Sequence, residues 1–151
     1  MVDRATWERL YRRAFPEVYR AVAATVLDPD LALDAVQDAF EIGLRHPPAD
    51  VNVTGWLFRV ALRRATRARL RKPRGLLPSE YVSELDHALD RIETSRLLAL
   101  LTPRQRAVVV AHYFLGLRQE EIAQSFGIRR GTVGATIAHA LSRMREVKGS
   151  V

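Results

Sequence analysis

The chain has 151 residues, enough for one domain or two small ones, which excludes a large multi-domain enzyme. Its 24 Lys and Arg residues outnumber 17 Asp and Glu residues, and the net charge of +7 makes a polyanion, above all nucleic acid, the first partner to expect. The absence of cysteine excludes disulfide frameworks and thiolate zinc sites, and the lack of a signal-peptide core or of about 18 consecutive apolar residues predicts a cytoplasmic protein without membrane insertion.

Apolar residues recur at helical spacing nearly everywhere and no alternating run indicates a strand, so the sequence predicts an all-α fold. The first helix should carry the apolar stripe from Trp7 to Val26, and Pro16 is expected to kink or restart it. Asp28 can cap a second helix, which the prolines at 47 and 48 should end. A third helix is expected over about residues 54–72, with these residues turned inward: Trp56, Leu57, Val60, Ala61 and Ala68.

Charge divides the chain into three segments. Residues 1–72 have a net charge of +4 and residues 96–151 a net charge of +6, whereas residues 73–95 have a net charge of −3. Two prolines and a glycine open the acidic segment, which favours a linker that becomes helical towards its end. We therefore predict two small basic helical domains, 1–72 and 96–151, joined by an acidic linker.

The third helix should carry a row of arginines at four-residue spacing along one side, namely Arg59, Arg63, Arg67 and Arg71. From Trp56 to Arg74 there are eight basic residues and no acidic one. Because like charges one turn apart repel, an unmixed row indicates an external anion such as the nucleic-acid backbone. The alternative is a basic face that serves solubility or pairs with the acidic linker. Two roles are open for Trp56, stacking on an unpaired base and packing in the core.

In the C-terminal segment, Thr102-Pro103-Arg104-Gln105 is a capping-box pattern, so a helix should begin there. Residues 119–140, QEEIAQSFGIRRGTVGATIAHA, have the pattern of a helix-turn-helix, with Ala123 for close helix approach, Gly127 for the turn and Val133 as apolar anchor. The second of its helices, expected from about residue 129 to 147, would present to a major groove Arg129, Arg130, Thr132, Thr136, His139 and Arg143. The alternative is an ordinary helical hairpin with surface arginines.

A polar patch on the second predicted helix comprises Asp34, Gln37, Asp38 and Glu41. No cleft-forming glycine loop or histidine lies near these carboxylates, so they indicate a protein-contact or solvated surface rather than a catalytic pair. The four histidines are scattered, and neither an HExxH motif nor a glycine-rich phosphate loop occurs. We therefore expect neither an enzyme nor a metal or cofactor site.

Taken together, these stretches resemble the extracytoplasmic-function (ECF) group of bacterial RNA polymerase sigma factors, over nearly the whole chain. Residues 7–72 are similar to region two of that family through WERLYRRAFPEVYR, LDAVQDAFEIGLR and GWLFRVALRRATRARLRK. Residues 96–147 are similar to region four through LLALLTPRQRAVVVAHYFLGLRQEEIAQSFGIRRGTVGATIAHALSRMRE. The resemblance implies a specificity subunit that binds core RNA polymerase, recognises and opens promoter DNA, and has an anti-sigma factor as a further partner.

The resemblance also implies roles for individual residues. Contact with the coiled coil of the polymerase β′ subunit is implied for the family's core-binding motif, here Asp34, Gln37, Asp38 and Phe40, with Phe40 as packing. The loop 47–54 would face the unpaired strand of the minus-ten element, and the implied contacts there are Asn52, Trp56, Arg59, Arg63 and Arg67. The minus-thirty-five element would be approached by Arg129, Arg130, Thr132 and Thr136.

Two departures from the family pattern fall on the DNA-contacting stretches. Arg63 and Arg67 stand where the family commonly has asparagine and aspartate, so phosphate attraction would replace base selection there. The familiar GTVKSR is GTVGAT at residues 131–136, which removes two basic contacts, and Gly134 costs about 1 kcal/mol relative to alanine in a helix. These departures leave a second hypothesis open, namely a sigma-like helix-turn-helix regulator that binds DNA but does not direct transcription initiation.

Overall fold

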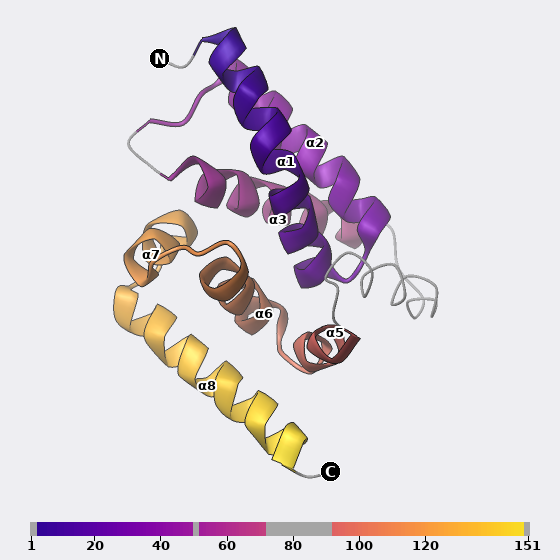
Figure 1. Cartoon of the computed structure of the whole chain (residues 1–151), viewed down its shortest axis with the longest axis vertical. Coiled ribbons are helices and arrows are strands. Elements are labelled where there is room, and N and C mark those ends of the chain that lie inside the picture. The colour runs from indigo at the N-terminus through magenta and orange to yellow at the C-terminus, as the bar shows by residue number, and fades with distance from the viewer. Residues whose placement is uncertain (1–2, 50–51, 72–91, 150–151) are drawn as a thin grey trace.

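The computed structural model describes residues 3–49, 52–71 and 92–149, and within these ranges the chain is helical with no strand. The all-α prediction is confirmed. The N-terminal module comprises α1 (Arg4–Val26), α2 (Pro29–Arg45) and α3 (Val53–Arg71). The C-terminal module comprises α5 (Ile92–Ala99), α6 (Pro103–Val109), the π-helix η1 (Val110–Phe114), α7 (Gln119–Phe126) and α8 (Arg130–Gly149). Figure 1 shows the two modules side by side, with α6 and α7 next to α1 and α3.

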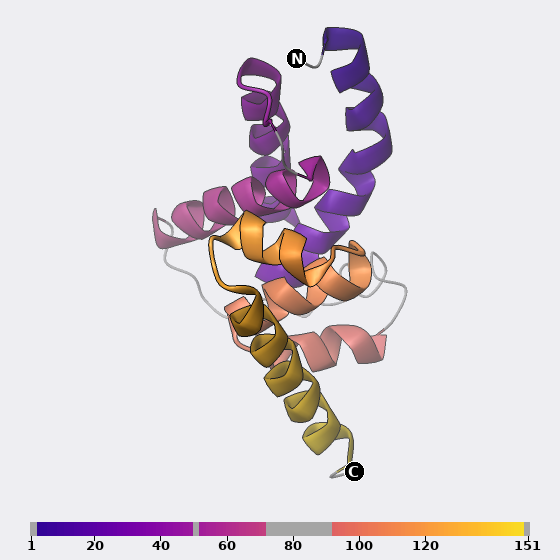
Figure 2. The same ribbon diagram turned by 90° about the vertical axis from the view of Figure 1, so that its left-hand side faces the viewer.

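The first helix is capped by Asp3, whose carboxylate accepts from the Thr6 backbone N–H at 2.7 Å, and it runs without interruption to Val26. Of the two effects predicted for Pro16, a restart of the helix does not occur, whereas a kink agrees with Figure 2, which shows the axis of α1 bending in its middle. Proline removes one backbone hydrogen bond, but the buried side chains before and after it pack on one core. That shared packing keeps the two halves in a single helix.

Local capping explains where the next two helices begin. The Asp28 carboxylate accepts from Leu31 N–H at 3.1 Å with proline at the first position of α2, as predicted. The Asn52 carbonyl Oδ1 accepts from Gly55 N–H at 3.0 Å at the start of α3. Of the residues predicted to turn inward on α3, Leu57 and Ala61 are fully buried, whereas Trp56, Val60 and Ala68 are only partly buried.

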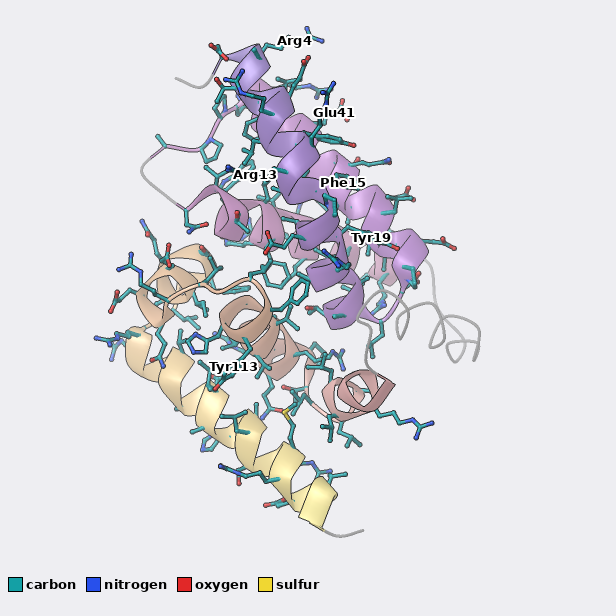
Figure 3. The ribbon with its side chains drawn as sticks, viewed as in Figure 1. Arg4, Arg13, Phe15, Tyr19, Glu41 and Tyr113 are labelled. Carbon is teal, nitrogen blue, oxygen red and sulfur yellow. The ribbon has the colours of Figure 1, made fainter. Side chains whose placement is uncertain are left out.

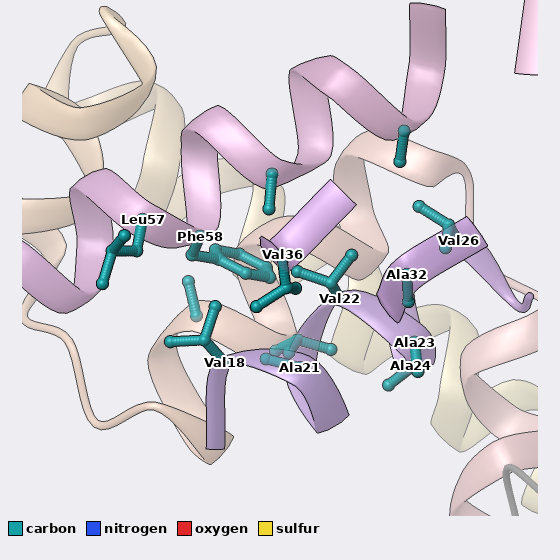
Figure 4. Packing of buried hydrophobic residues seen from close by; sticks show 14 of the residues in the cluster. Val18, Ala21, Val22, Ala23, Ala24, Val26, Ala32, Val36, Leu57 and Phe58 are labelled. Atoms are coloured by element: carbon teal, nitrogen blue, oxygen red, sulfur yellow. The ribbon is translucent and has the colours of Figure 1, made fainter. Parts of the chain in front are cut away.

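Small and branched side chains fill the centre of the N-terminal module, where α1, α2 and α3 meet. Figure 4 shows Val18 and Val22 of α1 packing with Val36 of α2 and with Phe58 of α3, all at most 1% exposed. At the outer end of the bundle the Trp7 indole donates to the Phe40 carbonyl at 3.2 Å. The core thus holds α2 and α3 in a fixed relation, which positions the polar patch and the arginine row.

The C-terminal module begins with the predicted capping box. Thr102 Oγ1 accepts from Gln105 N–H at 3.2 Å, and the Gln105 side chain accepts from Thr102 N–H at 3.1 Å. Gly127 adopts a left-handed conformation with φ of 64° between α7 and α8, as the helix-turn-helix pattern predicts. The predicted linker lies outside the described residues up to residue 91, and its end is helical in α5, as expected.

The two modules contact each other through buried groups. Arg106 of α6 is only 6% exposed, and its Nε donates to the Thr25 carbonyl at the end of α1 at 2.7 Å. Phe58 of α3 and Phe126 of α7 form an edge-to-face ring pair with centroids 6.2 Å apart. Among the described helices, none is long and apolar enough to cross a membrane.

Candidate nucleic-acid interface

The residues predicted for a major groove lie on α8 and directly before it. The exposed members are Arg129, Arg130, Thr132, His139 and Arg143, and Thr136 is partly buried. Val133 and Ala140 are fully buried against the rest of the module. By helical spacing Thr132, Thr136, His139 and Arg143 share one side of α8. Arg130 lies on another side, where it pairs with Glu120 of α7, and Arg129 precedes the helix.

The ion pairs on this surface are exposed, so replacing the carboxylate partner of an arginine costs little free energy. Arg130 lies 3.5 Å from the Glu120 carboxylate of α7, and Arg143 lies 3.8 Å from that of Glu146. Exposed pairs of this kind contribute about 0–1 kcal/mol. A phosphate can therefore replace either carboxylate at small cost.

The basic residues of α3 do not all lie on one face. Arg63 and Arg67 are exposed, and Arg59 is partly buried, where burial first and the charge of Arg63 second lower its pKa. Arg64 instead faces Asp38 of α2 at 3.4 Å, and Arg69 donates to the Val26 carbonyl of α1. The cationic surface of α3 is thus formed by exposed Arg63, Arg67 and Arg71, with partly buried Arg59 at one end of the row.

Trp56 is partly buried against the core, with its ring close to Gly43 of α2. A Cβ added at Gly43 would lie 3.1 Å from that ring and 2.3 Å from the Trp7 ring. Both indole rings therefore lie close to Gly43, where any larger residue would collide with the Trp7 ring. Packing is thus one established role of Trp56.

Asn52 has two partners, and only one of them is local. Its Oδ1 caps α3, while its Nδ2 donates to the Glu121 carboxylate of α7 at 2.6 Å. Hydrogen bonds hold the pKa of Glu121 below its ordinary value: chiefly the Arg118 backbone N–H, against partial burial, and then the side chains of Asn52 and Arg118. The sequence pattern of the first helix of the helix-turn-helix contains no signal for this contact, because the partners are 69 positions apart.

The residues of α2 that the resemblance assigns to core binding comprise polar side chains at the surface and one buried ring. Asp34 and Gln37 are exposed, and Asp38 is partly exposed beside Arg64. Phe40 is 2% exposed and packs among the rings of Trp7, Tyr11 and Phe15. Figure 3 shows Phe15 and Tyr19 along one side of α1. The ring of Phe40 therefore supports the patch from within.

No cluster of His, Asp or Glu that could hold a metal ion occurs in residues 3–49, 52–71 and 92–149. The arrangement offers cationic and hydrogen-bonding surfaces. Such surfaces bind phosphates and base edges. One lies on α3 and the other on α8, so each module has its own.

Comparison with known proteins agrees with this arrangement. A family model described as "Sigma-70, region 4" matches residues 91–144. The chain is 30% identical over 155 residues to the ECF RNA polymerase sigma factor SigM of Mycobacterium tuberculosis, which covers 97% of this chain and 79% of that protein. It is 32% identical over 149 residues to the RNA polymerase sigma-E factor of Streptomyces avermitilis, with 93% and 83% covered.

Two solved structures share the fold across both modules. The sigma factor RpoE in complex with the anti-sigma factor NepR from Bartonella quintana has a TM-score of 0.72 at 20% identity, over 94% of this chain and 96% of that chain. CnrH in complex with the cytosolic domain of CnrY has a TM-score of 0.74 at 22% identity, over 98% and 90%. The relatives match nearly the whole chain and are themselves sigma factors, which does not favour a regulator that has lost initiation. The chain belongs to the ECF family of RNA polymerase sigma factors, the subunits that direct transcription initiation.

Proposed function

We propose that the two modules bind different partners, as the sequence predicts. Residues 1–72 bind core polymerase and the minus-ten element, residues 73–95 form the linker, and residues 96–151 bind the minus-thirty-five element. The observation that carries this assignment is the separation of charge. An acidic patch lies on α2, while the cationic rows lie on α3 and on α8. A protein partner and a DNA partner can therefore bind at the same time.

Core polymerase contacts α2 through Asp34, Gln37 and Asp38, and the β′ coiled coil is the partner that the family resemblance implies. The exposure of Asp34 and Gln37 supports this role, and the buried ring of Phe40 supports the helix from behind. Arg64 orients Asp38 from α3, since the two side chains lie 3.4 Å apart and are each 45% exposed. Arg64 was not singled out by the sequence patterns, because its partner lies on another helix.

Promoter DNA is bound mainly through the arginine row of α3 and the basic residues on and before α8. Each phosphate that they neutralise contributes about −0.9 to the slope of log affinity against log salt for duplex DNA. Arg63 and Arg67 act as phosphate contacts, in keeping with their exposure.

Gly134 of α8 is partly buried, and a Cβ there would lie 3.3 Å from the Gln119 side chain of α7. Position 134 faces α7, so a side chain there would be poorly placed to contact a base.

An anti-sigma factor is the expected regulator. Both similar solved structures are complexes: one is the sigma factor RpoE with the anti-sigma factor NepR, and the other is CnrH with the cytosolic domain of CnrY. Such a partner could cover the α2 patch or either cationic row. We place the protein in the cytoplasm, where core polymerase is available.

The direct test is transcription in vitro with core polymerase and a genomic promoter library. We expect new transcript starts that share two upstream elements when the protein is added. The Asp38→Arg variant should lose core binding, because a positive charge replaces the carboxylate that lies beside Arg64. The Glu8→Arg variant makes the same charge change at an exposed site on α1 and should bind core normally. Equal co-elution of both variants with core polymerase would remove α2 from the interface.

The DNA assignment has its own test. Replacing Arg129 and Arg130 by alanine should weaken duplex binding, by about 1 to 3 kcal/mol in a base-dependent way if either residue reads a base edge. Arg145→Ala, at an exposed position further along α8, is the matched control and should change binding little. An equal loss on every DNA sequence would assign these arginines to phosphates only.

A further inference from the structure

A cavity of about 290 Å³ lies where the end of α1 and the C-terminal half of α3 meet α6 and the end of α7. Much of its wall is apolar, and Leu62, Val108 and Phe126 are among the side chains that line it. Pockets that hold small organic molecules combine such walls with a few polar groups that fix the orientation of the ligand. The volume is close to that of the smallest ligand pockets, so the cavity can take a small molecule.

The polar part of the lining is cationic. Three arginines line the cavity, namely Arg69, Arg104 and Arg106, and no aspartate or glutamate occurs among its described lining residues. Burial first and the charge of Arg69 second lower the pKa of Arg106, so these two guanidiniums lie close enough to repel each other. An anion in the cavity would offset that repulsion.

Arg106 has one nitrogen available for a ligand. Its side chain is only 6% exposed, and its Nε and Nη1 donate to the carbonyls of Thr25 and Leu101 at 2.7 and 3.1 Å. Among the described residues, no hydrogen bond engages Nη2, which carries two further N–H groups. The carbonyls accept hydrogen bonds but carry no net charge. Because an unpaired donor of a buried charged group is costly, an anionic acceptor in the cavity would be bound favourably.

We propose that this cavity is a binding site for a small organic carboxylate, whose charged end accepts from Nη2 of Arg106 and whose apolar body packs against Leu62 and Phe126. Arginine forms strong, charge-assisted hydrogen bonds with carboxylates, and exposed Arg104 adds its charge at the rim. A bare phosphate ion would leave the apolar wall uncovered, which favours a ligand with a hydrocarbon part. None of the described lining residues is among those assigned to DNA or to core polymerase.

The probe for this site is para-fluorobenzoate, which joins a carboxylate to a compact ring and is followed by fluorine NMR while the full chain is added. We expect saturable binding with a Kd of about 1 mM or below, which is attainable for a ligand of this size. The neutral analogue para-fluorobenzamide should bind at least about ten-fold more weakly, because it lacks the charge. Absence of saturable benzoate binding would overturn the proposal, and equal binding of the two compounds would refute the role of the arginines. Inorganic phosphate that competes as well as benzoate itself would refute the apolar contribution.

Two variants locate the site within the chain. Thr66→Phe adds a ring at an exposed position of the lining and should abolish binding by filling the cavity. Arg104→Met removes a cation from the rim and should weaken binding about two-fold or more at low salt. Arg145→Met removes the same charge from an exposed position of α8 and should bind the probe like the original chain. Circular dichroism checks that each variant is folded. Normal binding by Thr66→Phe would show that the probe binds outside the cavity.

The role of Arg106 is tested through its own signal, without a substitution. The Nε–H of Arg106 is buried and hydrogen-bonded, so it should give a distinct signal in nitrogen–proton NMR spectra of the chain. Benzoate should shift this signal in a saturable way, with the same Kd as the fluorine titration. The Nε–H of Arg118, which bonds to Glu121 at the surface, is the matched control and should not shift. An Arg106 signal that stays in place at saturating benzoate would refute the proposed contact.

Discussion

Arg106 offers the sharpest test of how the two modules are held together. Its guanidinium is buried and donates through Nε to the Thr25 carbonyl at 2.7 Å and through Nη1 to the Leu101 carbonyl at 3.1 Å, with Leu98 at the limit of 3.5 Å. Thr25 lies in the last turn of α1, where carbonyls have no partner within the helix. Burial first and the nearby Arg69 second lower the pKa of Arg106, but an arginine remains charged.

The expected cost of Arg106→Met follows from these bonds. Two short bonds from a charged donor contribute about 1.5–3 kcal/mol each, and the desolvation cost of the buried charge offsets part of that sum. Methionine keeps the apolar stem and leaves the Thr25 carbonyl buried without its donor. We expect the free energy of unfolding to fall by about 3 kcal/mol, which lowers Tm by about 6–12 °C in a chain of this size.

Urea and thermal unfolding followed by circular dichroism measure this change. Arg104→Met is the matched control, because Arg104 lies on the same helix and is exposed. The control should stay within about 0.5 kcal/mol of the original chain. If Arg106→Met also stays within that range, the three carbonyl bonds do not stabilise the protein, and the reasoning from buried hydrogen bonds fails here.

Three further predictions concern single sites. Gly43→Ala should destabilise the N-terminal module by about 1–3 kcal/mol, because the new Cβ would lie 2.3 Å from the Trp7 ring; unaltered urea unfolding would contradict this. Thr102→Ala removes the side-chain cap of α6 and should cost about 1 kcal/mol in the same assay, with serine at that position restoring it. Glu121 has a lowered pKa, so its contribution to stability is present above the ordinary value of 4.5 and is lost as pH falls through the lowered pKa. The difference in unfolding free energy between the original chain and Glu121→Gln should therefore shrink on acidification, and a constant difference would show that the charge of Glu121 is not involved.

Local chemistry explains why much of the fold could be predicted from the sequence. The caps at Asp28 and Thr102 and the left-handed glycine at position 127 depend on residues within one turn of each other, and all three are confirmed. The spacing of the recognition-helix residues likewise follows from helical geometry alone. Pro16 is the exception, because its effect depends on whether both halves of α1 bury their apolar faces in the same core.

The sequence by itself determined the helical class, most helix starts, and the charge of each segment. Only the tertiary structure decided which cations remain available, because Arg64 faces Asp38 and Arg69 and Arg106 donate to carbonyls of α1. It also decided that Asn52 bonds to a residue of the other module. Hydrophobic spacing and caps act over a few residues and can be read along the chain, whereas these pairings arise when helices far apart in sequence pack together and bury their polar groups.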